Sequence, residues 1–333
     1  MGGDVARLLI RYVLLAIAVV CLNFFIPRLL PGDPLGFSSG EGTDPAVPLS
    51  AAAKAQLRAY YHLDEPLDRQ FASYLRELAR GDLGFSIARP APVAALLFAR
   101  LPWTLGLLLT SLLIAGMLGT ALGMMAGWRP GSARDRVLVS VMAALSALPE
   151  FLIAIGLLLV FSIGLGWFPL LGGQTAFSSY EDDAAGWVRW ALDILWHLTL
   201  PATTLVLSAA AGFLLIARDA TVGTHREPWL IVARAKGLRE RQVALGHALP
   251  NIAFPLLTFF ALRLGSVLGG ALVVERVFGV PGLGLLAFQS IRARDYPVLQ
   301  ALFLLAGLGV LAATFAAELA YLWLDRRRGS AYG

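Results

Sequence analysis

The chain reads Ala233-Arg234-Ala235-Lys236-Gly237 and then Ala248-Leu249-Pro250-Asn251 within one basic, amphipathic segment. This segment separates two long apolar runs, near residues 196–217 and 250–275. A long polar loop between two apolar runs indicates that the loop binds a partner in the aqueous phase. Residues 218–249 are therefore the part of the chain from which the rest of its organisation can be worked out.

The composition is that of a membrane protein. The 333 residues are 58% hydrophobic and 15% charged, and the mean hydropathy is +0.71. One apolar run could be a buried core helix, but several runs separated by Arg-bearing connections favour spans of about 20 residues each. Such runs lie near residues 8–30, 101–127, 138–167, 196–217, 250–275 and 297–323. The sequence predicts an all-α polytopic membrane protein with about six transmembrane helices.

The positive charge marks one side of the membrane. The net charge of +5 could suggest nucleic acid, but the arginines gather in every second connection and near both ends. They include Arg7, Arg11, Arg129, Arg134, Arg136, Arg218, Arg226, Arg234, Arg239, Arg241 and Arg326–Arg328. The positive-inside rule then places both termini and the 218–249 loop in the cytoplasm, and the acidic 168–195 loop outside. Arg276, Arg292 and Arg294 fit this topology less well.

Catalytic and metal-binding classes are disfavoured. Cys21 is the only cysteine, and the four histidines do not have the spacing of a metal site. Lys54 and Lys236 are the only lysines, and neither lies in a G-x-x-x-x-G-K-[ST] phosphate loop. We expect no catalytic residue, no metal and no ATP site in this chain.

Two further features concern helix packing and organisation. Gly119, Gly123 and Gly127 align on one face of a span, which permits close approach of another helix. Pro149, Pro201, Pro250 and Pro255 fall in or at the start of spans, as kinks absorbed by packing or as the lining of a wet central path. We expect three parts: the N-terminus and first span (1–30), an outer helical subdomain (31–100), and the membrane core (101–333).

Within the outer subdomain, a loop over 35–49 is followed by a helix from Ser50 to His62 and by a second helix that ends near Gly81. The apolar face expected of this second helix is Leu67, Phe71, Tyr74, Leu75 and Leu78.

The polar loop has its own helical signals. Thr224 and Glu227 have capping-box spacing, Pro228 suits a first turn, and Gly237 can end a short helix. The apolar positions of this helix are Trp229, Ile231, Val232 and Ala235, and those of a second short helix are Leu238, Val243 and Leu245. Small side chains at Ala233, Ala235 and Gly237 would let a protein partner approach closely, although a basic loop lying on anionic lipid is an alternative.

These residues resemble the EAA loop of binding-protein-dependent ABC importer permeases of the dipeptide, oligopeptide and nickel branch. The resemblance extends over nearly the whole chain. It includes Pro31-Gly32-Asp33-Pro34, Leu63-Asp64-Glu65-Pro66-Leu67, Gly81-Asp82-Leu83-Gly84, Pro149 with Phe151, Glu275 with Phe278, Pro281-Gly282-Leu283-Gly284 and Asp295-Tyr296-Pro297. Pro228 and Trp229 depart from the family pattern, in which an acidic residue followed by Tyr or Phe is common, as does Arg263, where many relatives are uncharged.

The resemblance implies a non-catalytic pore subunit of the bacterial inner membrane. It implies a second, homologous permease in a heterodimer, two ATP-binding cassette subunits that hold ATP and Mg, and an extracytoplasmic substrate-binding protein. The residues implied to contact the ATPase are Glu227, Ala233, Arg234, Ala235, Lys236, Gly237, Leu238 and Arg239. Short peptides are the expected solutes, with nickel chelates or other small peptide-like solutes as the alternative.

Three ionisable residues in or at the ends of spans are candidates for the translocation path. They are Glu150, Arg263 and Glu275. We expect Arg263 to face the cavity or to pair with a carboxylate such as Glu150. Two alternatives come from other classes of protein. An ion-driven secondary transporter would show internal repeats, which the sequence lacks. An intramembrane enzyme would need a nucleophile or a metal cluster.

Overall fold

The structure is a computed structural model that describes residues 2–29, 65–175, 184–265 and 267–329. The predicted loop over 35–49 and the predicted helix from Ser50 to His62 lie outside these residues. Within them the backbone is almost entirely helical, with one antiparallel bridge between Phe85 and Pro92. The predicted all-α class is confirmed.

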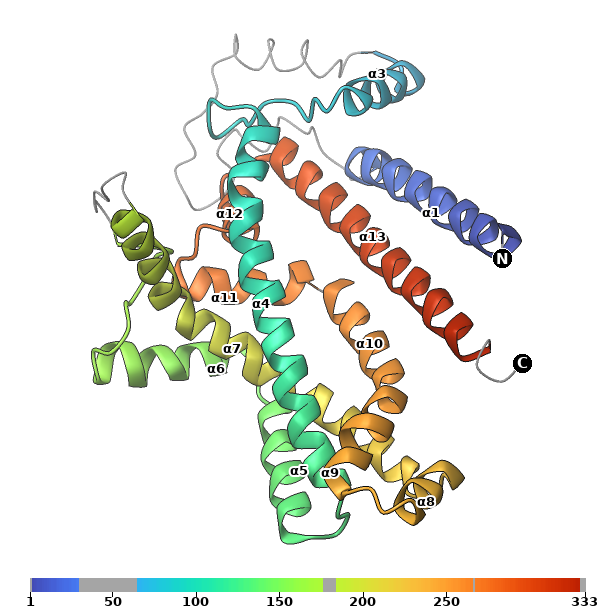
Figure 1. The fold of residues 1–333 in the computed structure, drawn as a ribbon. Coiled ribbons are helices and arrows are strands. Elements are labelled where there is room, and N and C mark those ends of the chain that lie inside the picture. Colours follow the sequence, from blue (N-terminus) through green and yellow to red (C-terminus); the bar gives the residue numbers. More distant parts are fainter. Residues whose placement is uncertain (1, 30–64, 176–183, 266, 330–333) are drawn as a thin grey trace. The chain divides into compact units, whose positions relative to one another are not determined.

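Figure 1 shows the helices in chain order. They are α1 (Gly2–Leu29), α3 (Leu67–Ala79), α4 (Val93–Gly127), α5 (Ala133–Ser146), α6 (Glu150–Leu157), the π-helical η2 (Leu158–Gly164), α7 (Ala184–Thr224), α8 (Pro228–Ala235), α9 (Glu240–Val243), the π-helical η3 (Ala244–Ala248), α10 (Leu249–Gly265), α11 (Val267–Phe278), α12 (Leu283–Arg292) and α13 (Tyr296–Gly329).

The prediction of about six spans agrees with these helices. By length and composition, five helical stretches of the described residues can cross a membrane: Val5–Ile26, Val93–Gly127, Ala185–Thr224, Glu240–Leu264 and Tyr296–Leu319. Two bent helix pairs are also apolar enough, which gives up to 7 spans.

The third predicted span, 138–167, differs from the structure. Ala133–Ser146 and Glu150–Gly164 meet at an angle of 98°, so this run is two helical arms and not one rod. Pro149 precedes the second arm with an extended backbone, φ −56° and ψ 141°, which a helix interior cannot accommodate. The prolines predicted to interrupt other spans do not end a helix, because α7 runs continuously through Pro201 and α10 runs continuously through Pro255.

A second sharp bend follows α11. Leu272–Phe278 and Leu283–Arg292 meet at 85°, around the Pro281-Gly282 turn. The predicted fifth span ends at residue 275, and the helix that follows the bend was not expected. This bend positions Glu275, which is described with the site below.

The chain divides into two compact units, each described by itself. One comprises residues 1–102 and 286–312, and the other comprises residues 103–285 and 313–333. In the first unit α3 packs on α1, where the ring of Phe24 is fully buried and lies 5.1 Å from Phe71 and 5.3 Å from Tyr74. Leu67 and Leu75, predicted for the same apolar face, are 52% and 41% exposed. Only part of the predicted apolar face of α3 is therefore buried by packing.

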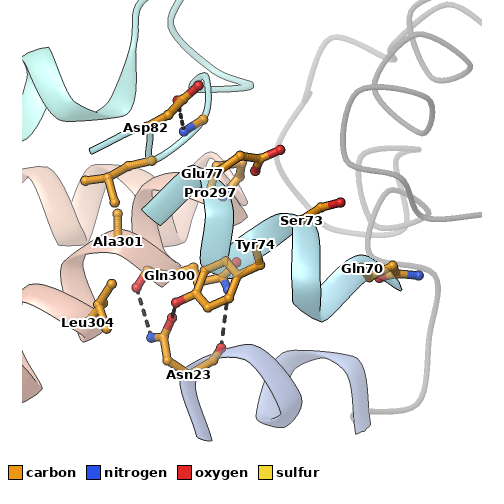
Figure 2. Close-up of a pocket in the computed structure, with 12 residues that line it drawn as sticks. Asn23, Gln70, Ser73, Tyr74, Glu77, Asp82, Pro297, Gln300, Ala301 and Leu304 are labelled. Atoms are coloured by element: carbon orange, nitrogen blue, oxygen red, sulfur yellow. Dashed lines mark hydrogen bonds between the residues drawn. The ribbon is translucent and has the colours of Figure 1, made fainter. Parts of the chain in front are cut away.

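A polar contact joins α1, α3 and α13 beside these rings. The Asn23 amide donates to the Gln300 carbonyl oxygen at 3.0 Å, and the Tyr74 hydroxyl donates to the Asn23 Oδ1 at 3.2 Å. Figure 2 shows these bonds beside a small cavity of about 70 Å³. In the same unit the buried Asp295 accepts bonds from the Ser86 hydroxyl and from the Ile87 amide at 3.0 Å, which fixes the loop before α4.

The second unit contains the predicted glycine seam. A Cβ atom at Gly119 would lie 2.7 Å from the Ala210 carbonyl oxygen, and one at Gly127 would lie 2.5 Å from that of Arg218. A Cβ at Gly123, between them, would overlap the Leu214 carbonyl oxygen. The spacing of four residues on α4 matches the spacing of four on α7, so the two helices touch backbone to backbone. The predicted packing role of these glycines is confirmed.

Candidate functional site

The polar loop between α7 and α10 contains the short helix α8. Pro228 occupies its first position, where the missing N–H is harmless, and the helix ends at Lys236 and Gly237. Gly237 has φ +74°, a backbone conformation that residues with a Cβ atom rarely adopt. The predicted end of the helix is confirmed. The capping box is wrong, because the Thr224 hydroxyl donates to Thr221 at 2.7 Å and so turns back into α7.

α8 has a buried face and an exposed face. Leu230 is fully buried and Ala233 is 5% exposed, and both pack with Val243 of α9. Ile231 and Val232, expected to be packing positions, are 66% and 52% exposed. The three-residue interval between Leu230 and Ala233 sets the inward face, and the residues between them point outward.

The predicted contact residues therefore divide. Ala233 is 5% exposed and offers almost no surface to a partner in this conformation, and Leu238 is half-buried against the same cluster. The exposed members are Glu227, Arg234, Ala235, Lys236, Gly237 and Arg239. Ile231 and Val232 join them as exposed apolar residues that were predicted for the wrong face. Periodicity alone does not single them out, because apolar residues occupy both faces of α8.

Polar bonds hold α8 against the ends of neighbouring helices. The Trp128 indole N–H donates to the Glu240 carboxylate at 2.9 Å, and the Arg234 Nε donates to the same carboxylate at 3.1 Å. His225 lies 3.2 Å from the Gly127 carbonyl oxygen, and its ring centroid is 5.6 Å from that of Trp128. We call Trp128, His225, Arg234 and Glu240 the brace. It links α8 and α9 to the last turn of α4 and to the residue that follows α7.

A prediction tests the brace. Glu240→Ala removes the shared acceptor, and because Arg234 and Glu240 are 42% and 59% exposed the loss is small, about 0.5–1 kcal/mol. We expect amide hydrogen exchange in residues 228–235 to become several-fold faster. Glu227→Ala is the control, since its exposed side chain caps nothing. Equal exchange in both variants would show that the brace does not hold α8.

Deeper in the unit, an ion pair ties the beginning of α5 to α7. The Arg218 Nη2 donates to the Asp135 Oδ2 at 3.0 Å, and Asp135 also accepts the Gly131 amide at 2.8 Å. Asp135 is only 3% exposed. Together with the glycine seam, this pair makes the end of α7 that leads into the loop a rigid extension of the helix bundle.

Comparison with known proteins identifies the family. The description "Binding-protein-dependent transport system inner membrane component" matches residues 119–330 of the chain. The chain belongs to this family. It is an integral inner-membrane permease component of an ABC-type import system, and the expected family is confirmed.

Relatives align along almost the whole permease. The oligopeptide transport system permease protein AppB of Bacillus subtilis is 33% identical over 98% of this chain and 99% of its own. The glutathione permease protein GsiC of Pectobacterium atrosepticum and the di/tripeptide permease protein DppB of Pseudomonas aeruginosa are each 34% identical, with 91% of both chains covered. The solved inward-facing MetNI methionine ABC transporter matches 69% of this chain and 96% of that one, with a TM-score of 0.54 at 16% identity.

The three path candidates of this permease lie in different settings. Glu150 begins α6 and accepts a bond of 2.8 Å from the Ser208 hydroxyl of α7. The Arg263 guanidinium lies 5.4 Å from the centre of the Phe259 ring on its own helix. The described partner of Glu150 is therefore Ser208, and the expected pairing with Arg263 is not what the structure shows. A path role for either residue stays a prediction.

Glu275 is different, because its side chain is fully buried. It accepts bonds from the Thr104 hydroxyl at 2.7 Å, the Gly284 amide at 2.7 Å and the Leu285 amide at 3.1 Å. A Cβ atom at Gly282 would overlap its carboxylate. The carboxylate thus caps the N-terminus of α12, where a negative charge is favoured, and holds the bend after α11.

Proposed function

We propose that the exposed face of α8, with Gly237 and Arg239 beyond it, is the surface on which an ATP-binding cassette subunit docks. One observation carries this proposal: the short helix α8, in the polar connection between α7 and α10, exposes Ile231 and Val232, at 66% and 52%, while its opposite face is fixed by packing. Exposed apolar residues with Arg234 and Lys236 beside them make a surface that suits a partner with an apolar groove and acidic rim.

The structure supports transmission of movement from this surface. α8 is braced to the ends of α4 and α7, and α7 continues as an unbroken helix of 41 residues. The glycine seam and the Arg218–Asp135 pair make α4, α5 and α7 move together. A displacement of α8 by closure of the ATPases would therefore tilt these helices as rigid rods. ATP and Mg would be bound by the partner subunits.

The remaining assembly follows the same proposal. A second, homologous permease would complete the path, and an extracytoplasmic binding protein would deliver the solute. The arginine-rich loops favour a cytoplasmic position for both termini, with residues 31–100 as an outer subdomain and 101–333 as the membrane core. The relatives are named for oligopeptides, glutathione and di/tripeptides, so we propose short peptides as the solute class.

Crosslinking tests the docking surface. Cys21 is the only cysteine, so a Cys21→Ser background permits single-cysteine probes. We expect Val232→Cys to crosslink to the ATPase subunit in the assembled transporter. Val188→Cys is a matched control, because Val188 is 57% exposed but lies at the opposite end of α7. Crosslinking at residue 188 alone would overturn the proposed docking face.

A further inference from the structure

A broad groove lies beside the brace, between the end of α4, the beginning of α5 and the α9–η3 segment. Its volume is about 1190 Å³, above the roughly 300–1,000 Å³ of ordinary ligand pockets. Its walls are mainly apolar and include Ala121, Leu122, Met125, Val137, Leu138 and Leu245. Met125, Val137 and Leu245 are 56%, 60% and 51% exposed, so no part of the described chain fills the groove.

Three arginines surround this apolar space. Arg129, Arg134 and Arg241 line the groove and are exposed. The nearby carboxylates are already used: Asp135 by Arg218 at 3.0 Å, and Glu240 by Arg234 at 3.1 Å. Among the described residues none of the three groove arginines has an ion-pair partner. The groove therefore offers three guanidinium groups to an anion from outside the chain.

The apolar residues and the arginines of the groove occupy different levels relative to the Val93–Gly127 span. Ala121, Leu122 and Met125 belong to the last turns of the Val93–Gly127 span, whereas Arg129 and Arg134 follow that span directly. A molecule that fits must carry its anionic group at the membrane surface and its apolar part within the bilayer. A phospholipid has this layout, and guanidinium groups bind its phosphate strongly.

We propose that this groove, which we call the lipid groove, binds an anionic phospholipid of the membrane. A second copy of the chain is a poor occupant, because a symmetric contact would bring the same arginines together. An acidic protein surface would pair with the arginines but leave the apolar walls of the groove exposed to water. The groove shares Trp128 and Glu240 with the brace, but no residue of the exposed face of α8 lines it.

Native mass spectrometry of the purified full chain tests the proposal. We expect it to retain phosphatidylglycerol in preference to phosphatidylcholine at equal concentration. A basic residue near an anionic lipid contributes roughly fivefold, so Arg129→Gln, Arg134→Gln and Arg241→Gln together should weaken phosphatidylglycerol retention by about 100-fold.

The matched control removes the same charge outside the groove. Arg136→Gln, Arg226→Gln and Arg239→Gln together change three exposed arginines that do not line it, and should leave retention near the wild-type level. Equal loss in both triple variants would mean a general charge effect and would overturn the site, as would equal retention of the two lipids by the wild-type chain.

A second variant tests the apolar part. Ala121→Trp would fill the groove while keeping its arginines, and should reduce phosphatidylglycerol retention. Glycerol phosphate, the headgroup without its chains, should not compete; if it competed fully, the site would bind a free phosphate and not a lipid. Crosslinking of Val137→Cys to a partner subunit in the assembled transporter would show that protein covers the groove, and would likewise overturn the proposal.

Discussion

Replacing Ala235 by Trp is expected to abolish ATP-driven uptake while the chain still inserts and folds. Ala235 is exposed on α8 and touches none of the buried cluster beneath, so a large side chain there disturbs nothing within the chain. Against a docked ATPase the indole would clash. A clash of ~3 kcal/mol weakens binding by more than 100-fold. Uptake of a labelled peptide into proteoliposomes, with ATPase subunits and ATP present, measures the loss.

Two controls separate size from other effects. Ala235→Ser keeps the side chain small and should transport normally. Gly237 has φ +74°, a backbone conformation that Asn adopts more readily than Val. Gly237→Asn should therefore retain far more uptake than Gly237→Val. Normal uptake by Ala235→Trp, in a preparation where ATP and the ATPase are required, would remove the docking surface from this face of α8.

The sequence predicted the membrane helices well because each depends on a property of the chain itself. Apolar length locates a span, and a spacing of four between Gly119, Gly123 and Gly127 identifies a face that another helix can touch. Gly237 signals a helix end because few other residues adopt its conformation. These features require no knowledge of which segments become neighbours.

The features that were missed depend on such neighbours. Pro149 was recognised as an interruption, but composition does not distinguish a kink from a bend of 98°. On α8, apolar residues occupy both faces, so periodicity did not reveal that Leu230 packs on Val243 while Ile231 remains outside. The side on which the packing partner lies is a tertiary property.

Glu275 illustrates the same limit most clearly. A carboxylate next to a span is by default a candidate for the path, and Glu275 was predicted to be one on that ground. Its bonding partners, Thr104 and the amides of Gly284 and Leu285, are up to 171 positions away in the chain. The nearby glycines Gly282 and Gly284 leave room for the carboxylate, a relation visible only once the bend is formed.

We therefore expect Glu275→Ala to destabilise the chain strongly. It would leave the buried Thr104 hydroxyl and Gly284 amide, and the partly buried Leu285 amide, without their acceptor beside a new cavity, at about 3–5 kcal/mol. Glu275→Gln keeps the shape and one acceptor oxygen, so its effect should be intermediate. The apparent unfolding temperature of the detergent-purified chain measures both variants.

Glu227→Ala provides the reference, because Glu227 is exposed and its side chain caps nothing, so its unfolding temperature should match that of the wild type. The comparison also distinguishes the two roles considered for Glu275. A residue that lines the path can be replaced by Ala with little change in stability but altered uptake. A residue that holds the bend loses stability first, and uptake falls only in proportion to the folded protein that remains. An unchanged unfolding temperature for Glu275→Ala, together with reduced uptake per folded molecule, would return Glu275 to the translocation path.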